Sequence, residues 1–375
     1  MLKTYLFRVI LIPAGVFVSV MFGGGAATGL EITTFMSSNG PVGGLVAISI
    51  VALLYSVMVF LCYEVARLRR AYDYQSFAVI ILGSKAWLIY EVSITLAMFG
   101  VVAYSTTGGA TALADFMGVS RFGVTAVILL AVAFLVFQGR RMVEVSMLLT
   151  TLLLLGASLL VAIGTITGNS GEVLGQLQDT TFDFPALGKR VWVYTVVISA
   201  YIPIILYAAK DLKSRAEVAF ASVASGIAIM LPFAAMHLSF LARFPEVLDQ
   251  EVPNAWIAEQ AMPGWFAGFF VVVLNVVILQ TAVGVVQGVI ERLDSWSQAS
   301  RERSLSKSQH AIVAAVILLA ALALSGFGVQ RLLGWMYSIS YWLFLLILFV
   351  PLVLVGGRII LRNREPVDSP VAHES

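Results

Sequence analysis

Three consecutive glycines and a nearby carboxylate are the residues best suited to bind a polar molecule. Gly23, Gly24 and Gly25 follow an apolar segment, and Glu31 comes about two helical turns later. Each glycine inside a helix costs about 1 kcal/mol relative to alanine, so the helix should break here. A broken helix offers free amides to a carboxylate and free carbonyl groups to a cation. Glu31 is costly to bury as a charge. It could bind an ammonium group, ligate a cation or carry a proton, or it could cap a helix at the outer mouth.

A second interruption is predicted near the middle of the chain, where Pro203 follows Ser199, Ala200 and Tyr201. Proline donates no backbone hydrogen bond and clashes with the preceding turn. The alternatives are an ordinary kink here and close packing of small residues at the glycines. The predicted solute site comprises the residues at both breaks: Gly23, Gly24, Gly25, Ala26, Thr28, Glu31, Ser199, Ala200, Tyr201 and Pro203.

The elements that carry these residues must be membrane helices. Of the 375 residues, 60% are hydrophobic and only 12% are charged, whereas soluble domains average about 25% charged residues. The apolar residues fall in runs that reach the ~20 residues needed to span a bilayer. We predict an all-α integral membrane protein of about ten transmembrane helices, near 5–35, 42–66, 86–114, 122–138, 142–168, 190–210, 216–242, 264–291, 311–327 and 332–357.

The basic residues favour a cytoplasmic N-terminus. Most of the 23 lysines and arginines fall in alternate gaps between the predicted spans, which is the bias expected of cytoplasmic loops. An even number of spans then also places residues 358–375 in the cytoplasm as a charged tail. The bilayer is expected to be the cell inner membrane.

The two predicted breaks occupy matching positions in two halves of the chain. Residues 1–168 contain spans one to five, and residues 169–357 contain spans six to ten. Because each half has an odd number of spans, the halves are inverted relative to each other. Paired interruptions in corresponding spans of inverted repeats indicate the central site of a secondary transporter.

The first break also carries a family resemblance. The run from Gly23 to Ile32, G-G-G-A-A-T-G-L-E-I, resembles the G-A-G-F-A-S-G-Q-E-I signature of YkvI-like membrane proteins. These are relatives of the amino acid–polyamine–organocation (APC) transporters. The resemblance implies the LeuT fold of two inverted five-helix repeats, with the first and sixth helices broken. Gly24 stands in place of the usual alanine, and Leu30 in place of glutamine.

The same resemblance implies a sodium site between the first break and the eighth span. Phe22 lies at the break, Thr281 matches one of the expected hydroxyl ligands, and Gln280 stands where a second would be expected. Oxygen ligands suit a hard cation. Sodium is therefore slightly favoured over a proton as the coupling ion, and no other cofactor is expected.

Four residues are predicted to act as gates: Trp87, Tyr90, Glu91 and Tyr337. Aromatic belts at the membrane surface are the alternative for the aromatic residues, and an ion pair at the inner boundary, with Lys85 or the basic inner loop, is the alternative for Glu91. His237 could relay protons, although a packed, hydrogen-bonded histidine is favoured. The outer loop at 243–262 is either a short helix over the membrane mouth or a solvated connector.

Other function classes find little support. The three histidines are scattered, the single cysteine, Cys62, lies in an apolar run, and no metal-ligand spacing is present. We therefore expect no enzyme and no nucleic-acid partner. The expected function is cation-coupled symport of an amino acid or related small polar solute by alternating access. The alternative is an ion channel or a non-transporting membrane sensor.

Overall fold

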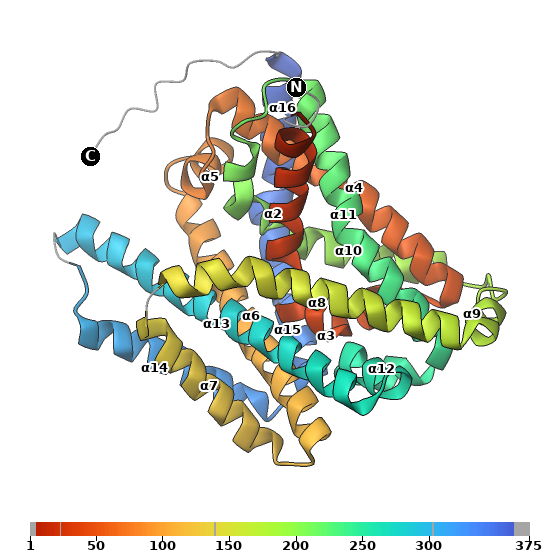
Figure 1. The fold of residues 1–375 in the computed structure, drawn as a ribbon. Helices are drawn as coiled ribbons and strands as arrows, with labels where there is room; N and C mark the ends of the chain where they lie inside the picture. The colour runs from red at the N-terminus through yellow and green to blue at the C-terminus, as the bar shows by residue number, and fades with distance from the viewer. Residues whose placement is uncertain (1–4, 23, 139, 302–303, 364–375) are drawn as a thin grey trace.

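The computed structural model describes residues 5–22, 24–138, 140–301 and 304–363 (Figure 1). Within these ranges every regular element is a helix. The elements are η1 (Phe7–Leu11), α2 (Ile12–Met21), α3 (Gly24–Thr28), η2 (Ile32–Met36), η3 (Ser37–Asn39), α4 (Pro41–Arg69), α5 (Tyr74–Leu82), α6 (Trp87–Met117), α7 (Arg121–Gln138), α8 (Arg140–Gly168), α9 (Ser170–Gln176), α10 (Phe184–Ser199), η4 (Ile202–Ala209), α11 (Arg215–Phe240), η5 (Leu241–Arg243), η6 (Glu246–Asp249), α12 (Pro253–Ala261), α13 (Gly264–Arg301), α14 (Lys307–Ser325), α15 (Val329–Phe344), η7 (Leu345–Phe349), η8 (Leu352–Gly356) and α16 (Gly357–Arg362).

The long apolar helices make this a multi-pass membrane protein. Among the described residues, 7 helices are long and apolar enough to cross a bilayer, and the bent pair α10 and η4 raises the number to 8. The remaining two predicted spans, 5–35 and 122–138, coincide with the shorter apolar helices Phe7–Val18 and Arg121–Phe137. The first predicted span is therefore not one continuous helix, because the chain leaves the helical path after Met21.

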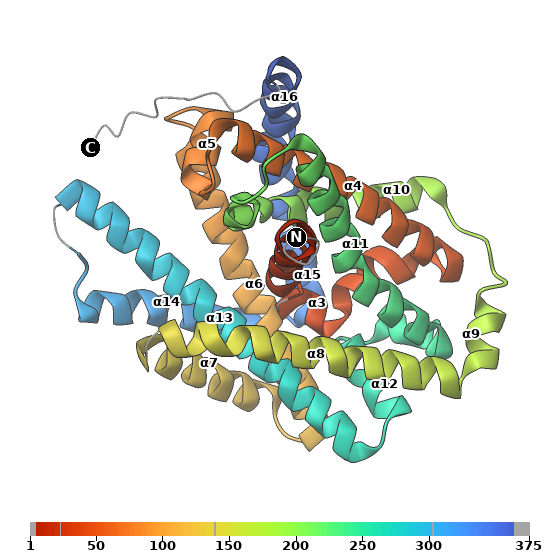
Figure 2. The ribbon, with the colours of Figure 1, turned by 45° about the horizontal axis from the view of Figure 1, so that its top comes forward.

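The broken first helix lies among the long helices (Figure 2). Helix α11 packs against both α4 and α2, and α6 packs against α3, α13 and α15. Figure 2 views α2 nearly end-on, with α3 and α15 close to it in the view. Phe22 and residues 25–33, on either side of the interruption, are buried in the protein, as required for interrupted backbone at membrane depth.

The first helix is interrupted twice. Helix α2 ends at Met21, and Phe22 leaves the helical region with φ −82° and ψ 12°; Gly23 lies outside the described residues. The second interruption is at Gly29, where φ is +83°. A side chain at Gly29 would be strained by this φ and would overlap Asn254. The predicted break is therefore present, and it extends beyond the glycine run.

The second break is a sharp bend. Helix α10 ends at Ser199, and its axis turns by 61° into η4. Pro203 lies in the first turn of η4, where a missing amide donor costs little. Proline therefore begins a new helix here, and an ordinary kink does not describe the bend.

Candidate functional site

The Glu31 carboxylate lies at the first break and is almost fully buried. Its side chain is 3% exposed, and the Tyr104 hydroxyl on α6 donates a hydrogen bond of 2.9 Å to Glu31 Oε1. A Cβ atom at Gly25 would overlap both of these oxygens. The absent side chain of Gly25 thus makes room for the Tyr104–Glu31 hydrogen bond. The structure brings Gly25 and Glu31 together as predicted and adds Tyr104.

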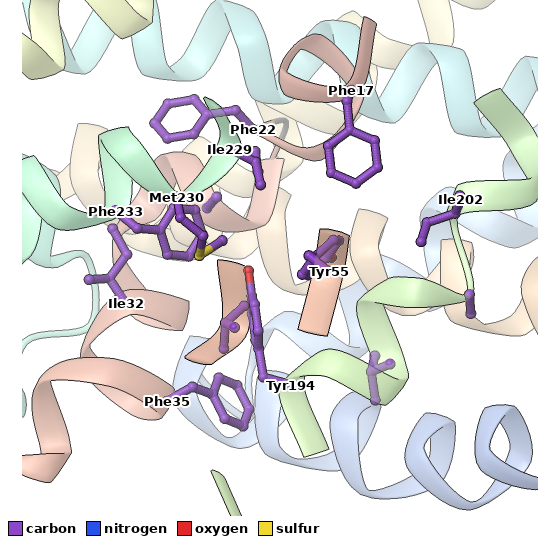
Figure 3. Packing of buried hydrophobic residues seen from close by; sticks show 14 of the residues in the cluster. Phe17, Phe22, Ile32, Phe35, Tyr55, Tyr194, Ile202, Ile229, Met230 and Phe233 are labelled. Carbon is purple, nitrogen blue, oxygen red and sulfur yellow. The ribbon is translucent and has the colours of Figure 1, made fainter. Parts of the chain in front are cut away.

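Aromatic rings form one side of the surroundings of Glu31. The rings of Tyr194 on α10 and Tyr337 on α15 stack with their centroids 6.1 Å apart and their planes at 9°. Phe35 on η2 lies 4.5 Å from the Tyr337 centroid and 5.3 Å from the Tyr194 centroid. Both tyrosines lie close enough to interact with the Glu31 carboxyl group. We call Phe35, Tyr194 and Tyr337 the aromatic cage. Figure 3 shows Phe35 beside Tyr194.

Several buried hydroxyl groups near this carboxylate have no hydrogen-bond partner among the residues that the structure describes. They belong to Tyr55, Tyr201 and Tyr337, and a further unpartnered hydroxyl, that of Ser199, lies at the second break. Tyr55 and Tyr201 lie within electrostatic range of Glu31. An unsatisfied buried hydroxyl costs about 1–3 kcal/mol, so a polar molecule between the two breaks would stabilise this arrangement.

Some of the free backbone groups at the breaks are occupied by side chains. The Thr28 hydroxyl donates to the Gly25 carbonyl at 2.8 Å. At the second break, the Tyr90 hydroxyl donates to the Ala200 carbonyl at 2.9 Å. Tyr90 was predicted to be a gate, and its hydroxyl ties α6 to the end of α10.

The loop helix α12 docks on the first break. The Asn254 side chain is fully buried, and its amide group donates to the carbonyl groups of Ala27 at 2.9 Å and Ala26 at 3.4 Å. Its other amide atom, Oδ1, is buried without a partner and would meet any side chain at Gly29. Of the two interpretations of the 243–262 loop, the short helix is confirmed.

We expect Asn254→Ala to loosen this contact, because it removes the side-chain amide that donates to the carbonyl groups of Ala26 and Ala27. Backbone hydrogen exchange in residues 24–31 and in α12 should become faster. Gln260→Ala, which truncates an exposed amide side chain on the same helix, is the matched control. Equal exchange in the two variants would show that Asn254 does not hold α12 on the break.

The predicted cation ligands make local contacts. The Thr281 hydroxyl donates to the Val277 carbonyl at 2.9 Å, which leaves its oxygen lone pairs free to bind a cation. The Gln280 side-chain oxygen accepts a 2.5 Å hydrogen bond from Thr150 on α8. The Phe22 ring packs against Phe233, with centroids 6.5 Å apart. In the described part of the chain, no group of three His, Cys, Asp or Glu residues could hold a metal ion.

Glu91 forms an ion pair, but with a different partner from the one considered in the sequence. Arg292 Nε on α13 lies 3.2 Å from Glu91 Oε1, so the Lys85 pairing is wrong. The Arg292 guanidinium also donates to Thr95 at 3.1 Å and lies 5.2 Å from the centroid of the Tyr74 ring. Glu91 therefore links α6 to α13, and Trp87 begins the same helix α6.

His237 is a packed, hydrogen-bonded histidine, the alternative that the sequence favoured over a proton relay. The Ser37 hydroxyl and the Pro41 carbonyl each lie 2.8 Å from one of its ring nitrogens.

Two ion-pair clusters fasten the end of the bundle that carries η1 and α16. Arg8 on η1 binds both carboxylate oxygens of Glu217, at 2.6 and 2.9 Å, and also the Asp211 carbonyl. The fully buried Glu64 accepts hydrogen bonds of 2.8 Å from Arg67 and from Arg215. These clusters connect η1 with α11, and α4 with α11.

Comparison with known proteins identifies the fold. No protein-family model and no curated protein matches the sequence. Among solved structures, MhsT in complex with L-phenylalanine is 16% identical over 95% of this chain and 88% of its own, with a TM-score of 0.57. A mutant of the Eremococcus coleocola manganese transporter is 13% identical over 98% of this chain and 83% of its own, with a TM-score of 0.54. The chain therefore has a LeuT-like membrane fold with its first and sixth helices broken.

Proposed function

We propose that the protein is a secondary active transporter that carries an amino acid or related small polar solute by cation-coupled symport and alternating access. The observation that carries this proposal is the buried Glu31 on the first of two broken helices, with the unpartnered hydroxyl groups of Tyr55 and Tyr201 near it. The similar fold of MhsT, whose structure contains L-phenylalanine, supports a solute of this size. Membership of the YkvI-like family within the APC superfamily is part of the proposal, as is the division into inverted repeats at 1–168 and 169–357.

The solute would lie at the residues of the two breaks, with Glu31 as the charged group. Thr281, Gln280 and the Phe22 backbone would bind the coupling ion, with sodium slightly favoured over a proton. Trp87, Tyr90, Glu91 and Tyr337 would line the path as gates. The protein would lie in the inner membrane with both termini in the cytoplasm, as the basic residues favour.

Uptake into proteoliposomes tests this function. We expect saturable uptake that requires an inward gradient of sodium or of protons. A current proportional to voltage and independent of any gradient would instead indicate a channel. Solute binding without flux would indicate a sensor. Either of these results would contradict the proposed transport.

We expect Thr281→Ala to weaken the stabilisation by sodium, because one hydroxyl oxygen ligand is lost. A loss of about 1.4 kcal/mol corresponds to a tenfold rise in the sodium Kd. Sodium titrations monitored by thermal unfolding measure this, because a ligand at free concentration L that binds only the folded state stabilises it by RT ln(1 + L/Kd). Thr281→Ser, which keeps the hydroxyl, is the matched control and should retain the response. An unchanged sodium response in Thr281→Ala would remove this residue from the site.

A further inference from the structure

The carboxylate of Glu31 has no basic partner. The Tyr104 hydroxyl donates a hydrogen bond to it, and the hydroxyl groups of Tyr194 and Tyr337 lie nearby. Buried or half-buried basic groups near the bundle interior pair elsewhere: Arg67 with Glu64, and Arg292 with Glu91. Within the described ranges, no lysine, arginine or histidine interacts with Glu31. This distinguishes Glu31 from Glu64, which is also buried.

An unpaired buried carboxylate is costly. The effective penalty for burying one ion is several kcal/mol, and an opposite charge at short range offsets it. Tyrosine hydroxyl groups only partly supply that compensation, because they carry no net charge. A positively charged ligand would therefore gain more here than a neutral one, and a ligand carboxylate would be repelled by Glu31.

The aromatic cage adds a second preference for positive charge. The face of an aromatic ring is electronegative, and a cation within about 6 Å of the ring centroid gains about 0.5–2 kcal/mol. Phe35, Tyr194 and Tyr337 come from η2, α10 and α15, so the cage forms where both broken helices meet α15. The unpartnered hydroxyl groups of Tyr55, Tyr201 and Tyr337 can accept hydrogen bonds from an ammonium group.

Resting on the proposed transport function, we infer that the solute is an organic cation whose ammonium group pairs with Glu31 and lies against the ring faces of the aromatic cage. The solute would carry no carboxylate. This narrows the expected class from amino acids and related small polar solutes to amines without a carboxylate.

Matched ligands separate these classes. The full chain, purified in detergent, is titrated at constant pH and sodium concentration with phenethylamine, L-phenylalanine and 2-phenylethanol, and with choline and putrescine as amines of other shapes. Thermal unfolding reports binding. We expect at least one amine to stabilise the protein, and every probe without net positive charge to bind at least about tenfold more weakly, a difference of about 1.4 kcal/mol.

Variants test the assigned residues with the best amine. Glu31→Gln should weaken its binding at least about tenfold. Glu172→Gln, which neutralises an exposed carboxylate on α9, should leave it unchanged. Tyr337→Leu keeps the carboxylate and removes one ring of the cage. It should weaken binding about fivefold, so it provides a second readout if Glu31→Gln does not fold.

Three results would overturn the inference: binding of L-phenylalanine as tight as that of the amines, amine binding that is unchanged in both Glu31→Gln and Tyr337→Leu, or no stabilisation by any amine. A failure of the proposed transport function would give different results from a failure of the inferred solute class. Amine binding that depends on Glu31, without gradient-driven uptake, would overturn the transporter and leave the cation site in place. Gradient-driven uptake of L-phenylalanine by Glu31→Gln would overturn only the inferred class.

Discussion

Gly25→Ala is expected to lower the initial rate of solute uptake about tenfold or more. The added methyl group would overlap Tyr104 Oη and Glu31 Oε1, and neither group can withdraw freely, because both are buried. Overpacking of this kind costs roughly 1–3 kcal/mol. We expect the overlap to displace the Glu31 carboxylate, since Gly25 and Glu31 lie on the same broken helix.

Gly15→Ala is the control for this experiment. Gly15 lies on α2 of the same broken helix, and a Cβ atom there would meet nothing within 4 Å. Both variants should elute from size exclusion as the wild type does, and uptake in proteoliposomes should separate them. Equal uptake by the two variants would show that the Tyr104–Glu31 arrangement is not needed for transport.

The largest loss of stability is expected for Glu64→Gln. Glu64 is fully buried and receives hydrogen bonds from Arg67 and Arg215. Removing one partner of a buried ion pair leaves an uncompensated charge and costs about 3–5 kcal/mol. Arg215 also donates to the carbonyl groups of Ile360 and Asn363. The attachment of the C-terminal helix to α11 should therefore weaken as well.

Thermal unfolding in detergent measures this effect, with the exposed Glu172→Gln as control. Replacing the whole cluster by apolar residues, Glu64→Leu with Arg67→Met and Arg215→Met, should recover much of the loss, because no buried charge then remains. If Glu64→Gln unfolds at the wild-type temperature, the cluster contributes nothing to stability.

Local chemistry explains why the breaks were predictable. Glycine lowers helix propensity and proline cannot continue a preceding helix, and an interruption lies beside each of them. Gly29 was not predicted to be a second interruption, because a single glycine is tolerated in a helix. Its positive φ becomes evident only when Asn254 packs against it.

The partners of Glu31 could not be predicted, because they come from distant parts of the chain. Tyr104 is 73 positions away from Glu31, and nothing in its span distinguishes it from the aromatic residues of membrane surfaces. The same limitation explains why the sequence pointed to Lys85 as the partner of Glu91 and not to Arg292. Lys85 is near Glu91 in sequence, whereas Arg292 reaches it only through the packing of α13 on α6.

The hydrogen bonds of Arg8 limit how two segments of the protein can move. Its guanidinium holds Glu217 and also the carbonyl of Asp211, which comes shortly after η4. The segments that precede the first break and follow the second are therefore tethered through one side chain. While this tether persists, we expect the two segments to move together, so that probes on η1 and η4 keep their separation.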